Sequence, residues 1–486
     1  MSATSYAVTL DSRFAQRLPK LATPWTSPNY PDLKPLLLND QLASELGLDA
    51  DFLHTPAGAG FLSGTNLPAD AKPVSQAYAG HQFGAYSPFL GDGRAALLGE
   101  IQTPSGDRRD VHLKGSGETR FSRGGDGLAA LGPMLREYLV SEAMHALGIP
   151  TTRSLAVFTT GRPVFREGAL PGALLVRTAS SHIRVGSFQY ARATDDLDLL
   201  RTLADFALER HYPQALQAEN LYLELLRRVT EAQAQLVAQW MLVGFIHGVL
   251  NTDNVMISGE SIDYGPCAFM DTYHPGTVFS SIDTLGRYAY GRQPSITLWN
   301  LARFAETLLP LIDADTDGAV AKATSVIEEF RGLYAANWVR GMRRKLGLST
   351  KILDDDARPL TESLLTVLES GQVDYTGFFR ALTDAVAGNQ EPLESLATSV
   401  SGMKDWIQDW QDFNPSAEMM RQANPIYIPR NHLVEEALEA AVSGDMALFN
   451  KLFELVTNPF DEQPNTDRFT EPAPSTFGPF MTFCGT

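Results

Sequence analysis

The feature that most constrains the fold is a change of pattern near residue 193. Before it, short apolar or alternating runs recur between glycine-rich and charged turns, and they predict strands of an antiparallel sheet: AALLGEIQ, DVHLKG, SLAVFTTG and ALLVRTA. One helix is predicted among them over Leu135–Leu147, ended by Gly148 and Pro150. After residue 193, apolar residues at helical spacing predict helices over 197–209, 220–244, 295–312, 318–346, 359–369 and 433–455. Strands followed by helices indicate an α+β chain with the two kinds of structure in separate lobes.

The same pattern divides the chain into four predicted parts. Residues 1–76 are expected to form an N-terminal extension packed on the body, and residues 77–192 a small lobe with the sheet and its helix. Residues 193–457 are expected to form a large, mainly helical lobe. The proline-rich tail, residues 458–486, shows no strong periodicity and is expected to run over the surface in extended form.

The charge balance excludes some classes of partner. The 486 residues include 39 basic and 57 acidic ones, which gives a net charge of −18. Nucleic acids and anionic membranes favour basic surfaces, so neither is expected as the main partner. The start of the chain has no basic stretch followed by an apolar run, and the most apolar segment, 236–250, is too short to span a membrane. We expect a soluble, cytoplasmic and monomeric protein.

A polar segment in the helical half carries the strongest chemical signal. It has the sequence HGVLNTDN from His247 to Asn254, and the tripeptide Asp-Tyr-Gly follows at 263–265. The two motifs resemble the catalytic loop and the metal-binding Asp-Phe-Gly element of protein kinases. Asn254 and Asp263 would then bind divalent cations that bridge nucleotide phosphates, because hard cations prefer oxygen ligands. With the strands and helix that precede them, the motifs predict a protein-kinase-like fold of two lobes.

One position departs from the kinase pattern. The catalytic base of a kinase is an Asp two residues after the His of the loop, and here that residue is Val249. Valine cannot accept a proton from a substrate hydroxyl, which argues against ordinary phosphoryl transfer. Asp253 is the nearest carboxylate that can serve as base, although an acidic loop residue can also simply cap backbone groups.

A lysine of the small lobe extends the kinase-like pattern. Lys114 ends an alternating run, and in kinases such a lysine holds ATP phosphates and pairs with a glutamate of the next helix. Glu137 is the candidate partner, and Glu142 on the same predicted helix is an alternative that the spacing leaves open. Taken alone, Lys114 is more typical of a solvated strand end.

A glycine-rich turn before this lysine is a candidate for phosphate binding. Gly91 and Gly93 allow the backbone to approach a ligand, and Arg94 supplies a cation. Asp92 between the glycines is unusual for a loop over phosphates, so we expect it to contact another group. A simple hairpin turn is the more common explanation for two glycines at this spacing.

A second turn and two arginines are further candidates. The turn GGDG includes Asp126 and Gly127 and precedes the predicted helix, where backbone N–H groups can bind an anion. Arg177 and Arg184 flank a Ser-containing segment, and guanidinium groups bind phosphate through two parallel hydrogen bonds. A plain turn and surface ion pairs are the alternatives for these two features.

Six motifs spread over the chain carry a closer resemblance. They are ASELGLD at 43–49, AYAGHQFG at 77–84, LGDGRA at 90–95, FSR and GDG within 121–127, HGVLNTDN at 247–254 and DYGP at 263–266. Together they resemble the selenoprotein O family, also called SelO or YdiU, over nearly the whole length. The pair AYAGHQFG and LGDGRA is specific to that family.

The resemblance implies a function and a set of site residues. Members of the family are pseudokinases that transfer AMP from ATP to protein hydroxyl groups, with the nucleotide flipped so that the α-phosphorus faces the acceptor. It implies Asp253 as proton acceptor, Asn254 and Asp263 as ligands of Mg²⁺ or Mn²⁺, and Lys114 paired to Glu137. The ATP contacts would be Gly91, Gly93, Arg94, Lys114, Asp126, Gly127, Arg177, Arg184 and, through the metal, Asp263. The partners would be proteins with Ser, Thr or Tyr acceptors, and UTP with Mn²⁺ is a second implied donor.

Two other functions remain open on the sequence. An atypical kinase that uses Asp253 as its base would transfer the γ-phosphate instead of AMP. An inactive pseudokinase would bind nucleotide and act as a scaffold. The joint presence of the lysine, the glutamate and the residues of a metal site argues against the scaffold, because binding alone does not require them.

The chain has two cysteines, Cys267 and Cys484, too few for a disulfide framework. In some members of the family a residue near the C-terminus bonds a cysteine of the activation segment. Cys267 is the only available partner here, and it does not match the family's usual position. We therefore expect two free thiols in a reducing compartment.

Overall fold

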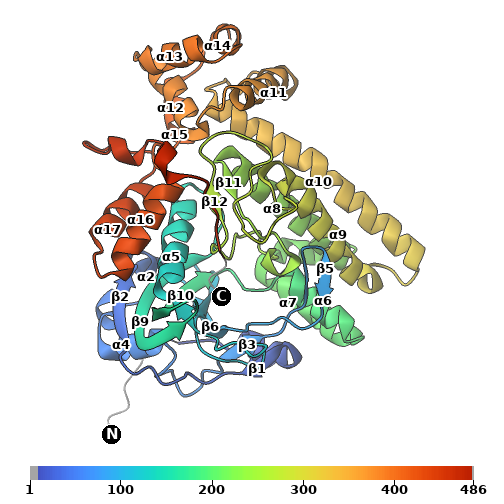
Figure 1. Ribbon diagram of the computed structural model, residues 1–486. Helices are drawn as coiled ribbons and strands as arrows, with labels where there is room; N and C mark the ends of the chain where they lie inside the picture. Colours follow the sequence, from blue (N-terminus) through green and yellow to red (C-terminus); the bar gives the residue numbers. More distant parts are fainter. Residues whose placement is uncertain (1–8, 484–486) are drawn as a thin grey trace.

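An antiparallel sheet of eight strands forms the core of the smaller lobe. The computed structural model describes residues 9–483, and the strand order is β1-β3-β6-β7-β10-β9-β2, with β8 paired to β10. In Figure 1 the sheet lies in the lower part of the molecule and the helical lobe lies above it. The strands are β1 (Ala22–Pro24), β2 (Lys34–Leu38), β3 (Val74–Gln76), β6 (Ala95–Gln102), β7 (Arg108–Lys114), β8 (Ala129–Ala130), β9 (Arg153–Phe165) and β10 (Ala169–Ala179).

Both faces of this sheet are covered, which explains why β10 is apolar at successive positions. Leu175 of β10 belongs to the core that includes helix α5 (Leu131–Ala146), whereas Leu174 and Val176 belong to the core on the other face. Successive strand residues point to opposite faces, so a strand buried on both sides needs apolar side chains throughout. The second face is covered by α2 (Asp40–Glu45), α3 (Ala50–Leu53) and α4 (Pro56–Leu62).

The segment predicted as an N-terminal extension thus takes part in the sheet. It supplies the terminal strands β1 and β2 of the sheet path, the neighbouring β3 and the three helices of one covering layer. The predicted divisions at residues 76, 192 and 457 stay predictions. The predicted class, an α+β fold with a kinase-like antiparallel small lobe and a large helical lobe, is confirmed.

Helix α5 (Leu131–Ala146) connects the two lobes. It starts one turn before the predicted Leu135, and 12 of its 16 residues are buried. It packs against β9 and β10 on one side and against α16 (Asn431–Val442) and α17 (Ala447–Val456) on the other (Figure 1). A helix with neighbours on several sides is apolar around most of its circumference. Its end at Gly148, whose φ is +74°, agrees with the predicted stop.

Several helices of the larger lobe begin at side-chain caps. Asp196, Asn220 and Asp315 each accept a hydrogen bond from a backbone N–H in the first turn of the helix that follows. The helices are α6 (Val185–Ala193), α7 (Leu197–His211), α8 (Leu221–Leu242), α9 (Gln293–Ile312), α10 (Thr316–Lys345), α11 (Asp354–Ser370), α12 (Tyr375–Val386), α13 (Glu391–Ser399), α14 (Met403–Gln411), α15 (Ala417–Ala423), α16 (Asn431–Val442) and α17 (Ala447–Val456).

One predicted helix is wrong as a single element. The helix expected over 433–455 consists of α16 and α17, which pack against each other. Gly444 lies between them with φ +101°, a conformation that ends a helix and that side chains other than glycine rarely adopt. The apolar spacing on both sides of Gly444 suggested one continuous helix.

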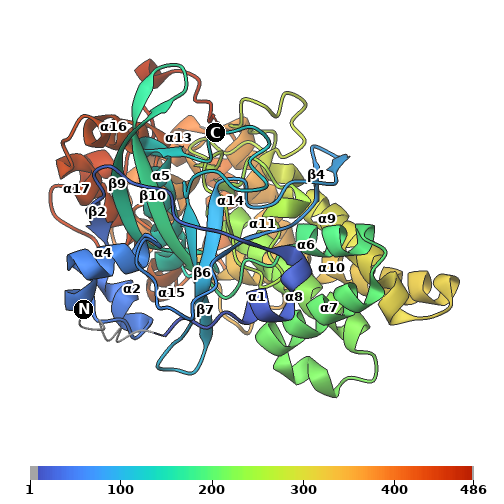
Figure 2. The same ribbon diagram turned by 90° about the horizontal axis from the view of Figure 1, so that it is seen from below.

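The segment between α8 and α9 carries the predicted chemical motifs. The motifs lie between the short strands β11 (Phe245–Ile246) and β12 (Ala268–Phe269), which pair antiparallel. A separate hairpin, β4 (Gly80–Gln82) and β5 (Ala85–Ser87), leaves the sheet and lies against the helical lobe beside α9 (Figure 2). No helix within residues 9–483 is long and apolar enough to cross a membrane.

The tail returns to this segment. After residue 457 it contains two short 3₁₀ helices, Asp467–Phe469 and Ser475–Phe477. Near its end, Thr482 is buried, and its hydroxyl donates a hydrogen bond of 2.7 Å to the carbonyl of Pro266. The described tail therefore ends next to the Asp-Tyr-Gly motif.

Candidate active site

One cavity between the lobes gathers the predicted site residues. It has a volume of about 420 Å³, and every predicted site residue except Glu137 lines it. Its walls come from the turn before β6, the end of β7, the glycine-rich turn at 121–128, β10 and the catalytic loop. Residues as far apart in the chain as 91 and 263 thus face the same space.

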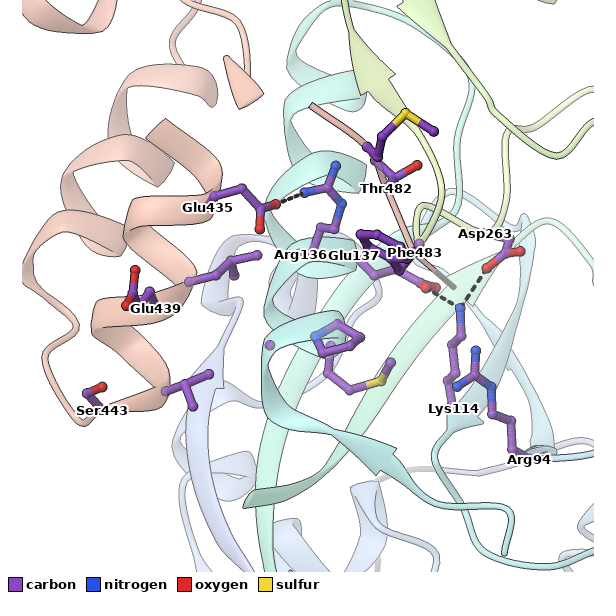
Figure 3. Close-up of a pocket in the computed structure, with 17 residues that line it drawn as sticks. Arg94, Lys114, Arg136, Glu137, Asp263, Glu435, Glu439, Ser443, Thr482 and Phe483 are labelled. Carbon is purple, nitrogen blue, oxygen red and sulfur yellow. Dashed lines mark hydrogen bonds and ion pairs between the residues drawn. The ribbon is translucent and has the colours of Figure 1, made fainter. Parts of the chain in front are cut away.

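Lys114 lies between two carboxylates at the edge of this cavity. Its Nζ donates to Glu137 Oε2 and, at 2.9 Å, to Asp263 Oδ1 (Figure 3). Glu142, the alternative partner, instead pairs with Arg153 and accepts from the backbone N–H of Ser154. Glu137 also accepts a hydrogen bond of 2.9 Å from Arg177, so its buried carboxylate is shared by two cations.

These cations keep the two carboxylates ionised. Burial by itself disfavours a charged carboxylate, but Lys114 and Arg177 outweigh it and lower the pKa of Glu137. Asp263 is buried too, but the charge and hydrogen bond of Lys114, together with the charge of Arg94, outweigh the effect of burial. The pKa of Asp263 therefore lies far below its ordinary value. Asp263 adopts a positive φ of 67°, which is uncommon for a residue other than glycine and frequent at functional sites.

Two arginines of the cavity wall have buried donors that are available to a ligand. Arg184 donates from Nη1 to the carbonyl of Asp253 at 3.1 Å, and its guanidinium lies 4.3 Å from the ring centre of Tyr78. Arg184 Nη2 and Arg94 Nη1 are buried without a hydrogen-bond partner among the described residues. Arg177 donates through Nε to His112 Nδ1 at 3.3 Å as well as to Glu137. Buried unpaired donors are costly, so two such guanidinium groups suit an anionic ligand such as a polyphosphate.

The glycines of the two turns are needed for contacts within the protein. Gly91 has φ +73°, and a Cβ there would lie 2.2 Å from the ring of Phe121. Gly127 has φ +66°, and a Cβ there would lie 2.1 Å from the carbonyl of Gly117. Both residues therefore let the two turns pack closely around the cavity, and larger residues would move the cavity wall.

The two aspartates of these turns have different surroundings. Asp92 is buried, accepts from the backbone N–H of Gln76 at 2.9 Å, and lies 3.3 Å from Nε2 of His112. It therefore contacts other groups, as its position among glycines suggested. Asp126 is exposed at the rim, where a bidentate ion pair with Arg166, at 2.9 and 3.1 Å, lowers its pKa.

Asp253 is the carboxylate at the centre of the catalytic loop. Gln82 donates to its Oδ2 at 3.1 Å, whereas its Oδ1 is buried without a partner in the described part of the chain. Burial raises the pKa of Asp253 to about 6, although hydrogen bonds from its own backbone and from Gln82 act to lower it. A carboxylate with this pKa is mostly ionised at pH 7 and accepts a proton more readily than an ordinary Asp. Val249 also lines the cavity and offers no such group.

The donor set of the loop fits a hard divalent cation. Asp253, Asn254 and Asp263 line the same cavity and offer carboxylate and amide oxygens. Asn254 donates from Nδ2 to the carbonyl of Val249 at 2.9 Å, which fixes the orientation of its amide. No cluster of three or more His, Cys, Asp or Glu side chains suited to a metal occurs within residues 9–483. Mg²⁺ is often held by one or two carboxylates together with substrate phosphates, so this set is sufficient for it.

Some residues of the site were not predicted. Tyr78 and Gln82 belong to the motif AYAGHQFG, which was quoted without a chemical role, and they contact Arg184 and Asp253. Arg123 and Arg166 also line the cavity. No spacing rule connects any of these four to the catalytic loop, so the sequence offered only the motif itself as a signal.

Cys267 is not arranged as a reactive thiol. It is buried and donates to the carbonyl of Tyr264 at 3.2 Å, and burial raises its pKa to about 12. Cys484 lies outside the described residues, so the expectation of two free thiols stays a prediction.

Comparisons with known proteins agree with these motifs. The family model described as "Protein adenylyltransferase SelO" matches residues 7–457. A "Protein nucleotidyltransferase YdiU" of Mycobacterium sp. (strain KMS) is 58% identical over 479 residues, with 99% of each chain covered. A protein of the same name from Pseudarthrobacter chlorophenolicus is 55% identical, and the match covers 100% of both chains. Another, from Cereibacter sphaeroides (strain ATCC 17029), is also 55% identical, and the match covers 98% of this chain and 99% of the relative. The chain belongs to the SelO family of protein nucleotidyltransferases.

Proposed function

We propose that this protein transfers AMP from ATP to Ser, Thr or Tyr hydroxyl groups of other proteins and releases pyrophosphate. The observation that carries the proposal is the position of Asp253. It lines the same cavity as Lys114 and Asp263, whereas the residue at the kinase base position is Val249. The family to which the chain belongs supports nucleotidyl transfer as the reaction class.

The proposed mechanism begins with the acceptor hydroxyl. The hydroxyl approaches Asp253, and Oδ1, which has no hydrogen-bond partner within residues 9–483, accepts its proton. The hydroxyl oxygen attacks the α-phosphorus of ATP in line with the bridging oxygen of the pyrophosphate. The new P–O bond joins AMP to the protein, and the bond to pyrophosphate breaks.

The cations of the cavity stabilise the negative charge of the nucleotide. Arg94 and Arg184 have unused donors for phosphate oxygens, and Arg177 and Lys114 add charge from the Glu137 side. Glu137 holds Lys114 and Arg177 in fixed positions and therefore pre-organises the site. Gly91, Gly93, Asp126 and Gly127 shape the turns that border the triphosphate in this proposal.

A divalent ion is part of the proposal. Asn254 and Asp263 would hold Mg²⁺ or Mn²⁺, which would neutralise phosphate charge when bound. Asp263 pairs with Lys114, so a divalent ion at this site would give its carboxylate a second cation. UTP as an additional donor belongs to the same proposal.

The setting of the reaction is also proposed. We expect a monomer that acts in the cytoplasm on protein substrates, with neither nucleic acid nor a membrane as partner. The net charge of −18 supports the expectation that nucleic acids and anionic membranes are not partners, because it disfavours binding to polyanions.

The products of ATP test the proposal. The purified protein would be incubated with ATP and Mg²⁺ or Mn²⁺, and the nucleotides and phosphates would be separated by anion exchange. We expect pyrophosphate in proportion to protein-bound AMP, and none with the variant Asp263→Ala. ADP as the only new nucleotide, again lost in Asp263→Ala, would identify a kinase. Binding of ATP without turnover would identify a scaffold.

A further inference from the structure

The β4–β5 hairpin is attached directly to the catalytic loop. His81, Gln82 and Phe83 each form a hydrogen bond with one residue of 251–253, at distances of 2.7 to 3.1 Å. One of these bonds joins Gln82 to the carboxylate of Asp253. The hairpin is therefore fixed relative to the proposed base, although it does not belong to the main sheet.

This attachment presents an aromatic ring at the mouth of the cavity. Phe83 has φ +52°, which bulky residues rarely adopt unless their surroundings hold them there. Its backbone N–H donates to Asn251 Oδ1 and to the hydroxyl of Tyr288, both at 3.1 Å. The side chain of Phe83 remains 38% exposed and lines the cavity.

Further apolar side chains surround the same opening. Ile282 is 52% exposed and lines the cavity with Phe83, and Leu285 is more exposed still. The two segments lie together, because the rings of Phe83 and Tyr288 are 5.1 Å apart. Exposed apolar groups that occur together on a protein surface often mark a binding site for another protein.

The opening also carries cations without a carboxylate partner. Arg123 is exposed and lines the cavity, and Arg287 stacks on Trp299 at 4.8 Å beside the turn of the hairpin. Neither arginine forms an ion pair with another residue within 9–483. Two acids lie nearby: Asp126 pairs with Arg166, and Asp283 is buried and accepts hydrogen bonds from the backbone. In a chain with 57 acidic and 39 basic residues, this mouth is apolar and positively charged.

We propose that Phe83, Ile282, Arg123 and Arg287 bind the acceptor segment of the substrate protein. They select a hydroxyl flanked by a large apolar residue and by acidic residues. Phe83, Ile282 and Arg123 line the same cavity as Asp253, so a substrate hydroxyl at Asp253 would bring its neighbouring residues close to these side chains. Apolar contact and opposite charge favour such a segment over a basic or wholly polar one. The inference rests on the proposed function and specifies its substrate class.

Matched synthetic peptides test the preference. Each set would carry Ser, Thr or Tyr as acceptor, flanked by Leu and two Glu, and would be compared with peptides in which Lys replaces Glu or Ser replaces Leu. The rate of AMP incorporation would be measured with the full-length protein and ATP labelled at the α-phosphate. We expect at least tenfold higher kcat/KM for the acidic, apolar peptide, and the preference should weaken as salt is added.

Three variants connect the preference to the surface. Ile282→Ser should raise the peptide KM about tenfold and leave the KM for ATP unchanged, because only the acceptor touches this side chain. Arg123→Glu should reverse the charge preference, so that the Lys peptide becomes the better substrate. Leu353→Ser, which removes a still more exposed apolar group at the start of α11, should change neither constant.

The outcomes separate this inference from the proposed function. Equal rates for all peptides, or transfer to the protein itself with none to peptides, would overturn the acceptor surface and leave adenylyl transfer intact. If Ile282→Ser and Arg123→Glu raised the KM for ATP as much as the KM for the peptide, these side chains would be assigned to nucleotide binding. That result would also refute the acceptor surface. Absence of any α-label in protein or peptide would contradict the proposed function itself.

Discussion

Replacement of Asp253 by asparagine is expected to stabilise the unliganded protein while it abolishes AMP transfer. Burial raises the pKa of Asp253 from its ordinary value of 3.8 to about 6. The folded protein therefore binds this proton more tightly than the unfolded chain does. Well below pH 4 the carboxyl is neutral in both states, and as the pH rises through the window between the two values the folded state loses stability. Above pH 6 the loss levels off.

The magnitude follows from the two pKa values. A shift of one unit corresponds to about 1.4 kcal/mol, so ionised Asp253 lowers the free energy of unfolding by about 1.5 kcal/mol at pH 5 and about 3 kcal/mol at pH 7.5. Asparagine keeps the shape and an acceptor for Gln82 but has no charge to bury. Asp253→Asn should therefore be more stable than the wild type by about twice as much at pH 7.5 as at pH 5.

Urea unfolding of both proteins at these two pH values, without nucleotide or divalent ions, measures the difference. Asp51→Asn serves as a control, because Asp51 is exposed and its replacement should change the free energy of unfolding by less than about 0.5 kcal/mol. A difference for Asp253→Asn that does not depend on pH would refute the argument from burial. A variant less stable than the wild type at pH 7.5 would refute it as well.

Three further predictions concern other parts of the molecule. Glu137→Gln should lower kcat/KM for ATP at least about 100-fold, because Lys114 and Arg177 lose their shared charge. Steady-state kinetics measure this loss, with Glu435→Gln as the control, since Glu435 is an exposed carboxylate of α16 that pairs with Arg136. Arg430→Met should lower the free energy of unfolding by about 3 to 5 kcal/mol. The buried Arg430 pairs with the carboxylates of Asp271 and Asp374, and both would lose this partner. Denaturant unfolding measures this loss, and a change below about 1 kcal/mol would contradict the reasoning. Cys267 should resist iodoacetamide in the folded protein and react after unfolding, as followed by intact mass; rapid alkylation of the folded protein would be incompatible with its burial and raised pKa.

Local sequence signals predicted the bounds of an element correctly where turn residues border it on both sides. The run AALLGEIQ coincides with β6, because charged and glycine-containing turns border it on both sides. Helix α5 begins earlier than predicted because Pro133 lies in its first turn, where proline is tolerated and does not end the helix. Helices α12 to α15 were not predicted, because each has only 7 to 12 residues. Apolar periodicity is recognised over about 11 to 18 residues, and a stretch of that length here includes turn residues as well as helix.

The site was predictable to the extent that its chemistry lies in short motifs. Lys114, Asp253 and Asp263 each stand at a recognisable place in such a motif, and the cavity includes all three. The contact between Gln82 and Asp253 spans 171 positions, and no spacing rule predicts it. The surroundings that raise or lower the pKa of a carboxylate come from the packing of the two lobes, which periodicity does not describe.

The most direct test of the central claim uses ATP labelled at either the α- or the γ-phosphate in parallel reactions. The protein would be incubated with each and with Mg²⁺ or Mn²⁺, separated on a denaturing gel, and compared with Asp253→Asn and Asp263→Ala. We predict that label from the α position alone becomes attached to protein and that both variants lose it. Label from the γ position alone would show phosphoryl transfer and would contradict the role that we assign to Asp253 in place of Val249.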